Sequence, residues 1–173
     1  FTIYFDRPFS VGDWIRSPDR DIEGKVEHIG WRVTAIRTFN KRLLYVPNSV
    51  FTTIALENPS RMSHRRIYEN IGVRYSDIGS LPKILDEVKA YLRQNTDIDQ
   101  NQTLMVNLDE FADSSVNFFI YVLTHTTNWS EYHQVKEKVL FEINEIIERN
   151  NSEIAFPTRT LHINNEVALN DLR

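Results

Sequence analysis

The sequence predicts a β-rich domain followed by an α+β domain, and three observations indicate this order. Up to about residue 60, short segments rich in β-branched and aromatic residues are separated by turn residues, which is typical of strands joined by tight turns. The remainder mixes such segments with two longer ones whose apolar residues recur every three or four positions, the helical period. Their order, β-α-β-β-α-β, is that of ferredoxin-like domains.

Four or five short strands are expected in the first domain, and together they predict a small barrel or curled sheet. In the second strand, Val26 and His28 should share one face, and Glu27 and Ile29 the other. Gly30 follows as a candidate bulge. The expected strands are 14–16, 24–29, 31–38 and 43–46, with turns at 17–21 and 39–42, a helical turn at 51–54 and a domain boundary within 58–66.

Four further strands are expected in the second domain. The strand at 67–75 alternates, with its odd-numbered residues on one face. The segment 116–123 is apolar on both faces, which predicts a central strand. The remaining strands are expected at 104–108 and 160–163, with a polar turn-like stretch at 94–102 and a turn at 109–115.

Two amphipathic helices are expected between these strands. The first begins after Asp77 or Ser80 as the capping residue, and the second begins after Asn128, with Glu131 three residues on as in a capping box. Each carries an apolar stripe at helical spacing. The stripes are Ile78, Leu81, Leu85, Val88 and Leu92 in the first helix, and Tyr132, Val135, Val139, Ile143 and Ile146 in the second.

Composition excludes several classes of function. The chain has no cysteine, which excludes disulfides, cysteine-ligated zinc and a thiol nucleophile. No stretch approaches the roughly 20 apolar residues that span a bilayer, and the chain starts at Phe1, so we expect a fragment or processed chain. Residues 1–66 carry a net charge of +4 and residues 67–173 one of −8. Either the basic part faces anionic lipid headgroups, or the two domains differ by chance.

Residues that could carry chemistry are sparse, and we expect no catalytic, cofactor-binding or metal-binding residue and no enzyme. The histidines show no ligand spacing; His125 and His133, eight apart, offer only a weak shared metal site. No glycine-rich phosphate loop occurs. The histidines are His28, His64, His125, His133 and His162, and the acidic cluster Asp109, Glu110 and Asp113 is interpreted as a solvated turn.

Basic and aromatic residues leave one alternative open, an RNA-binding module. Tyr68 and Tyr75 lie near a basic patch, but on opposite faces of the expected strand, and the net charge of −4 argues against a polyanion partner. We therefore expect no nucleic acid partner and interpret the patch as salt-bridging. Trp14 and Trp31 are expected to be core or interface residues. The patch consists of Arg61, His64, Arg65 and Arg66.

A set of motifs in a fixed order resembles the small-conductance mechanosensitive channel family. The resemblance covers nearly the whole chain, and the combined order is specific although each motif alone is weak. The motifs are Arg7-Pro8-Phe9-Ser10-Val11-Gly12-Asp13, Gly24-Lys25-Val26-Glu27, Thr34-Ala35-Ile36-Arg37-Thr38, Tyr45-Val46-Pro47-Asn48, Ile71-Gly72-Val73-x-Tyr75, Ser114-Ser115-Val116-Asn117-Phe118 and Ile154-Ala155-Phe156-Pro157.

The resemblance implies the fold and the role in more detail. It implies a junction after a missing pore helix at 1–9, an Sm-like β-domain at 10–60, a ferredoxin-like α+β domain at 61–163 and a tail at 164–173. Copies would form a ring, a heptamer, on the cytoplasmic side of the inner membrane. Ions and small solutes would pass through side portals into a vestibule below a pore opened by bilayer tension under osmotic stress.

Ring assembly also answers a physical need of small β-domains, whose open strand edges must be paired or blocked. We expect strands 43–46 and 31–38 to be such edges. The tail from Asn164 departs from the family pattern, in which a strand donated by each subunit closes the ring. No short motif marks the residues that line the portals.

Overall fold

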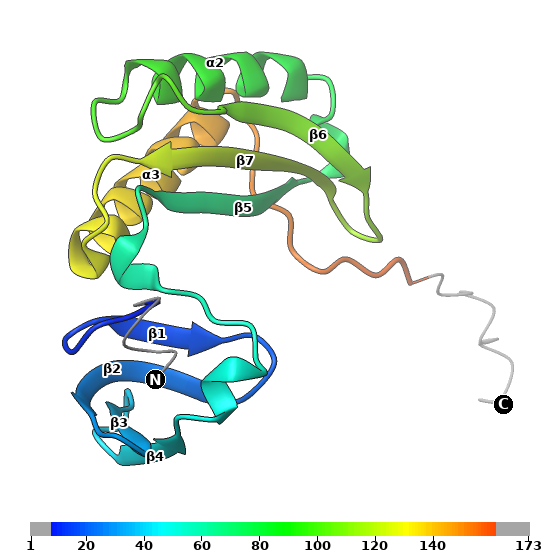
Figure 1. Cartoon of the computed structure of the whole chain (residues 1–173). Helices are drawn as coiled ribbons and strands as arrows, with labels where there is room; N and C mark the ends of the chain where they lie inside the picture. The colour runs from blue at the N-terminus through cyan, green and yellow to red at the C-terminus, as the bar shows by residue number, and fades with distance from the viewer. Residues whose placement is uncertain (1–7, 162–173) are drawn as a thin grey trace, which may run out of the picture. The chain divides into compact units, whose positions relative to one another are not determined.

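A computed structural model describes residues 8–161 and divides the chain into two compact units, Phe1–Ser63 and His64–Arg173. The first unit holds one β-sheet, and the second holds another sheet with both α-helices of the described residues. The β plus α+β class is therefore confirmed (Figure 1). The expectations for residues 1–7 and 162–173 lie outside the described residues.

The first unit is a four-stranded antiparallel sheet whose strands follow one another in chain order (Figure 1). An isolated bridge between Arg16 and Glu57 adds backbone pairing beside the first strand. Two 3-10 turns lead out of the sheet. The elements are β1 (Trp14–Ser17), β2 (Ile22–Ile29), β3 (Val33–Arg37), β4 (Leu43–Pro47), η1 (Val50–Thr52) and η2 (Pro59–Arg61).

Strand order corrects one of the two expected edges. β3 lies between β2 and β4, so the expectation of an open edge at 31–38 is wrong. β4 pairs only with β3 among the described strands and is an edge, as expected for 43–46. The sequence did not show this because the order of strands in a sheet depends on pairing between segments that are distant in the chain.

A β-bulge in β2 overturns the expected faces of that strand. The register between β2 and β3 shifts between Val26 and His28, so Glu27 is the extra residue. Glu27 and His28 are therefore both exposed, whereas Val26 is buried and Ile29 packs against the same core. The expected pairing of Val26 with His28 on one face is wrong, and the bulge lies here and not at Gly30.

The second unit packs two helices on one face of a three-stranded antiparallel sheet, ordered β5-β7-β6 (Figure 1). β7 is central, as its apolar sequence predicted, and every second residue of it is buried against the helices. The elements are β5 (Arg65–Val73), η3 (Tyr75–Asp77), α2 (Leu81–Gln94), β6 (Met105–Phe111), β7 (Val116–Thr124) and α3 (Trp129–Arg149).

Helix α3 forms as its local sequence predicts. Asn128 Oδ1 accepts a hydrogen bond from the Glu131 backbone N–H at 3.1 Å, which caps the first turn. The Glu131 carboxylate accepts one from Thr126 Oγ1, which in turn accepts from the Asn128 N–H, so the capping box closes through a third residue. The expected stripe faces the core; the buried residues are Val135, Val139, Ile143, Ile146 and Ile147.

Helix α2 begins one residue after Ser80, but no side-chain hydrogen bond caps it. Asp77 instead binds Arg74 and the backbone N–H of Glu153. Ile78 precedes the helix and is exposed, and its expected place in the stripe is wrong. The buried residues of α2 are Leu81, Ile84, Val88 and Leu92.

The second unit differs from the expectation in three further places. β6 extends to Phe111, so the acidic residues 109 and 110 lie in a strand and not in a turn. Within the polar stretch 94–102, Ile98 is buried and bridges to Thr124. Residues 160 and 161 form no strand; the place of the fourth ferredoxin-like strand is taken by a single bridge between Ile154 and Val73.

No helix within residues 8–161 has the length and apolar character to cross a bilayer.

Candidate functional site

The histidines are spread over separate environments. His64 Nε2 lies 2.9 Å from Asp99 Oδ2, and the Asn101 backbone N–H together with His64 lowers the pKa of Asp99. His133 instead packs against Tyr132 on α3, with ring centroids 5.1 Å apart. His125 is exposed at the end of β7. Within the described residues, no group of three or more His, Cys, Asp or Glu side chains is placed to hold a metal ion.

The residues of the basic patch are divided between the two units. Arg65 donates through Nε to the Thr127 carbonyl at 2.7 Å, and Arg66 lies over the rings of Tyr68 and Tyr121. Arg61 belongs to the first unit, where it lies 3.8 Å from Asp13 Oδ2. The guanidinium groups are therefore held by different partners.

The acidic cluster is exposed, as expected, although two of its members lie in β6. Glu110 Oε1 accepts a hydrogen bond from Asn117 Nδ2 at 3.0 Å, across the strand pair. Asp109 and Asp113 are exposed. All three carboxylates of the cluster are therefore exposed to solvent.

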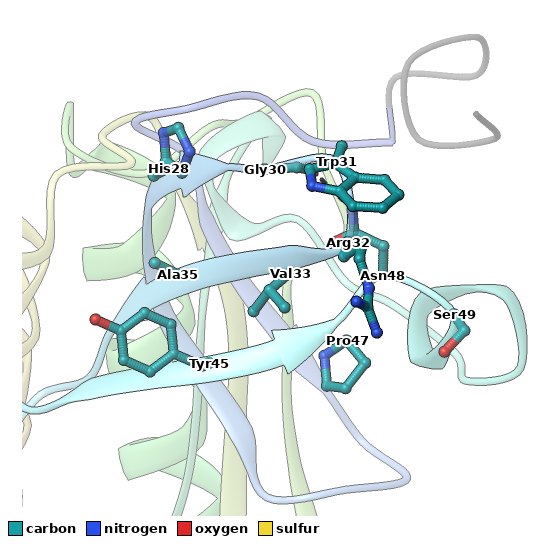
Figure 2. A pocket seen from close by; sticks show the side chains of 10 residues that line it. All are labelled: His28, Gly30, Trp31, Arg32, Val33, Ala35, Tyr45, Pro47, Asn48 and Ser49. Atoms are coloured by element: carbon teal, nitrogen blue, oxygen red, sulfur yellow. Dashed lines mark hydrogen bonds between the residues drawn. The ribbon is translucent and has the colours of Figure 1, made fainter.

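The most distinctive surface lies on the outer face of the first sheet. An open pocket of about 750 Å³ is formed there over β2, β3, β4 and the loops that join them (Figure 2). Trp31 is 86% exposed and Tyr45 is 64% exposed, which is unusual for such large apolar side chains. The lining residues are His28, Gly30, Trp31, Arg32, Val33, Ala35, Tyr45, Pro47, Asn48 and Ser49.

Strand register explains why apolar side chains gather on this face. Val33 pairs with Pro47, and Ala35 pairs with Tyr45. These residues share the side of the sheet that faces away from the core, whereas the alternate residues Ile36 and Val46 are buried. The β2 bulge adds His28, which pairs with Ala35. Figure 2 shows Val33, Tyr45 and Pro47 projecting from neighbouring positions of the two strands.

Trp31 is presented by a short hairpin loop and not by a strand, which corrects the expected strand 31–38. The Gly30 N–H donates to the Val33 carbonyl at 2.9 Å, so Trp31 and Arg32 are the two central residues of the turn between β2 and β3. The Arg32 guanidinium lies 5.4 Å from the Trp31 ring centroid. The Trp31 side chain is thus held in solvent at the rim of the pocket (Figure 2).

Asn48 fixes this loop from the end of β4. Its Nδ2 donates to the Gly30 carbonyl at 2.8 Å, and its backbone N–H donates to the Arg32 carbonyl at 2.8 Å. Its Oδ1 accepts from Thr34 Oγ1, also at 2.8 Å. Three hydrogen bonds from one residue make Asn48 a positioning residue for Trp31, a role that the Pro47-Asn48 motif did not reveal.

An ion pair borders the apolar surface. Arg37 donates to both carboxylate oxygens of Glu27, at 2.8 and 2.9 Å, and to the Lys41 carbonyl. This bidentate contact lowers the pKa of the Glu27 carboxyl and raises that of Arg37. An apolar centre with a charged border is the usual anatomy of a protein–protein interface.

Trp14, the other candidate aromatic residue, lies away from this pocket. Its ring packs on Phe39, with centroids 4.5 Å apart, and its Nε1–H donates to Glu23 at 3.3 Å. It is half-buried, whereas Trp31 is exposed.

Comparison with known proteins assigns both units. Residues 1–61 match the family model described as the mechanosensitive ion channel beta-domain, and residues 70–154 match the model of the MscS C-terminal region. Both models describe channel domains, so the RNA-binding alternative gains no support.

Relatives match over nearly the whole chain. The chain is 50% identical over 163 residues to the low conductance mechanosensitive channel YnaI of Escherichia coli, covering 94% of the chain and 48% of YnaI. It is 31% identical over 164 residues to the small-conductance mechanosensitive channel MscMJ of Methanocaldococcus jannaschii, covering 93% of the chain and 45% of MscMJ. The chain thus spans about half the length of these relatives.

Solved structures agree with the fold. The cryo-EM structure of Arabidopsis thaliana MSL1 superposes with a TM-score of 0.83 at 28% identity, covering 91% of this chain and 56% of that one. The crystal structure of Helicobacter pylori MscS in the closed state superposes with a TM-score of 0.77 at 28% identity. The match covers 95% of this chain and 62% of that one.

Proposed function

The chain belongs to the MscS family of mechanosensitive ion channels, and we propose that it is the vestibule-forming part of such a channel on the cytoplasmic side of the inner membrane. In this proposal copies of the chain form a closed ring, a heptamer. The ring encloses a vestibule that filters ions and small solutes below the pore. The pore, opened by membrane tension under osmotic stress, belongs to sequence outside these 173 residues.

The observation that carries this proposal is the outer face of the first sheet. Trp31, Val33 and Tyr45 are exposed on it, beside the open edge strand β4. Burying apolar surface stabilises association by about 25 cal/mol per Å², and an aromatic side chain can bury about 150–250 Å². A contact with a neighbouring copy would remove this surface from water and would also protect the β4 edge.

Domain limits are part of the same proposal. We propose a β-domain at 10–60 and an α+β domain at 61–163. The division of the structure after Ser63 and the end of the first family match at residue 61 support this boundary. Nothing in the proposed role calls for a cofactor or for catalysis.

Self-assembly can be tested on the full-length protein in detergent or nanodiscs by native mass spectrometry. We expect a heptamer for the unchanged protein. The double variant Trp31→Ser, Tyr45→Ser should shift the distribution to smaller species, because the contact loses its aromatic centre. Val11→Ser is the matched control, since Val11 is 59% exposed in the same unit and does not line the pocket.

Two outcomes would contradict the proposal. A full-length protein that is monomeric at every concentration would exclude the ring. A heptamer that the double variant leaves unchanged would exclude the outer face as the contact that carries it. Survival of hypo-osmotic shock, in cells whose other channels are deleted, checks the channel role separately: the unchanged protein should rescue them.

A further inference from the structure

The second unit has a bare sheet face. Both helices cover one side of β5-β7-β6 (Figure 1). Within residues 8–161, the other side carries aromatic side chains from β5 and β7. Tyr68 is 48% exposed and contacts the rings of Phe119 and Tyr121 edge-on, at 5.8 and 6.1 Å. Arg66 lies over Tyr68 and Tyr121, at 5.6 and 5.9 Å from their centroids. This face is therefore aromatic with a fixed positive charge.

On the opposite side of the unit, the outer surface of α3 forms a second exposed apolar surface. Phe141 is 64% exposed, and Ile154, which follows the helix, is 44% exposed. An open groove of about 530 Å³ lies between them. Two charged side chains line the same groove. Lys136 is paired with Glu69 of β5, so the exposed Glu137 gives this surface its negative charge, one turn before Phe141. We call it the α3 groove; it is lined by His133, Lys136, Glu137, Leu140, Phe141, Asn144 and Ile154.

These two surfaces match in charge and in spacing. Glu137 and Phe141 are four residues apart on a helix, which places their Cβ atoms about 5–6 Å apart. Arg66 and Tyr68 are two residues apart on one face of a strand, which separates them by about 6.5–7 Å. The distance between Glu137 and Phe141 in the α3 groove is thus nearly the same as the distance between Arg66 and Tyr68 on the sheet face.

From this match we infer that the bare sheet face of one copy docks on the α3 groove of the next copy, with Phe141 against Tyr68 and Glu137 paired with Arg66. The inference rests on the proposed ring and names its contact in the second unit. Because the two surfaces differ and lie on opposite sides of the layer, the contact is head-to-tail. Repeated contacts of this kind close into a ring when the rotation between neighbouring copies completes a full turn, whereas a contact between identical surfaces ends at a dimer.

Disulfide trapping tests the contact directly, and the chain offers a clean background because it contains no cysteine. The full-length channel carries Phe141→Cys and Tyr68→Cys together, with any cysteine outside these 173 residues replaced, and is oxidised in membranes. A disulfide requires Cβ atoms about 3.5–4.5 Å apart. We expect a ladder of cross-linked species up to the full ring on non-reducing gels.

Single variants and a matched pair separate the alternatives. Neither Phe141→Cys alone nor Tyr68→Cys alone should cross-link, since each residue would face a different surface. The pair Phe141→Cys, Lys83→Cys should also fail, because both residues lie on the helix side of the unit. Dimers from Phe141→Cys alone would show a helix-to-helix contact between identical surfaces and would overturn the inference.

Charge reversal gives a second, independent readout. Arg66→Glu should lower the fraction of full rings in native mass spectra several-fold, and adding Glu137→Arg should restore it. Rings that are intact but give neither the ladder nor the rescue would refute this contact and leave the ring proposal standing. Absence of any ring in the unchanged protein would refute the proposed assembly itself.

Discussion

Asp77 lies at the centre of a hydrogen-bond network whose removal has a calculable effect. Its Oδ2 accepts from Arg74 Nε at 2.8 Å and from the Glu153 backbone N–H at 3.0 Å. Its Oδ1 accepts from Arg74 Nη2 at 3.2 Å and from Ser76 Oγ at 3.1 Å. Asp77 is only 8% exposed, so it holds the end of β5 to the segment that follows α3. The change to test is Asp77→Asn.

An asparagine can accept only half of these hydrogen bonds. Whichever way its amide is turned, its NH₂ group replaces one carboxylate oxygen and faces two donors that it cannot accept from. Hydrogen bonds to charged groups contribute about 1.5–3 kcal/mol each, and neutral ones about 0.5–1.5 kcal/mol. Because two hydrogen bonds are removed, we expect Asp77→Asn to lower the free energy of unfolding of the second unit by about 2–4 kcal/mol.

Urea unfolding followed by circular dichroism at the helix band measures the unfolding free energy of the second unit, because both α2 and α3 belong to that unit. Glu153→Gln is the control. Its exposed carboxylate also binds Arg74, at 2.9 Å, but a surface ion pair contributes only about 0–1 kcal/mol, and the backbone N–H of residue 153 is unchanged.

Acid should remove the difference in unfolding free energy between the unchanged protein and Asp77→Asn. The hydrogen bond from Arg74 holds the pKa of Asp77 below its ordinary value of about 3.9. A carboxyl with a lowered folded-state pKa stabilises fully above its unfolded pKa, and that contribution is lost as the pH falls below about 4, through the folded-state pKa. A loss under about 0.5 kcal/mol at neutral pH, or an equal loss for Glu153→Gln, would refute the reasoning.

Three further substitutions test packing and backbone geometry. Phe118→Ala removes a fully buried ring from the core of the second unit and should cost about 3–5 kcal/mol by the same urea assay. Gly24→Ala should destabilise the first unit by about 1–3 kcal/mol or more, measured by tryptophan fluorescence, because the new Cβ would lie 2.3 Å from the Arg37 carbonyl oxygen, whereas Gly79→Ala meets nothing within 4 Å. Asn128→Ala removes the cap of α3 and should cost about 1 kcal/mol, seen as a lower urea midpoint with an unchanged slope.

Local signals made the second unit largely predictable from the sequence. The spacing of Asn128 and Glu131 predicted the start of α3, since a capping box is formed within one turn. The apolar run 116–123 predicted a central strand, and in the structure one face of this strand is buried while the side chains of the other face are half-buried. These features depend on residues that lie close together in the chain.

Features that depend on distant partners could not be predicted. The polar sequence around Ile98 hides a buried residue, because its burial comes from a bridge to Thr124. Strand order in the first sheet, and hence which strand is an edge, follows from pairing that composition does not encode. The outer-face pocket was not predicted for the same reason, since Trp31 was expected as a core or interface residue and Tyr45 as a strand residue, and only the register places both side chains on the outer face.

The bulge at Glu27 has a consequence for how this sequence can change over time. Val26 and Ile29 are three residues apart and would lie on opposite faces of a regular strand, but both face the core because Glu27 is bulged out between them. Deleting Glu27 would leave the pairs Val26–Ile36, His28–Ala35 and Ile29–Thr34 as a regular ladder, with His28 still facing outward and Ile29 still on the core side. Loss of a residue over evolutionary time should therefore be tolerated at this bulge, with the Glu27–Arg37 ion pair as the contact that is given up.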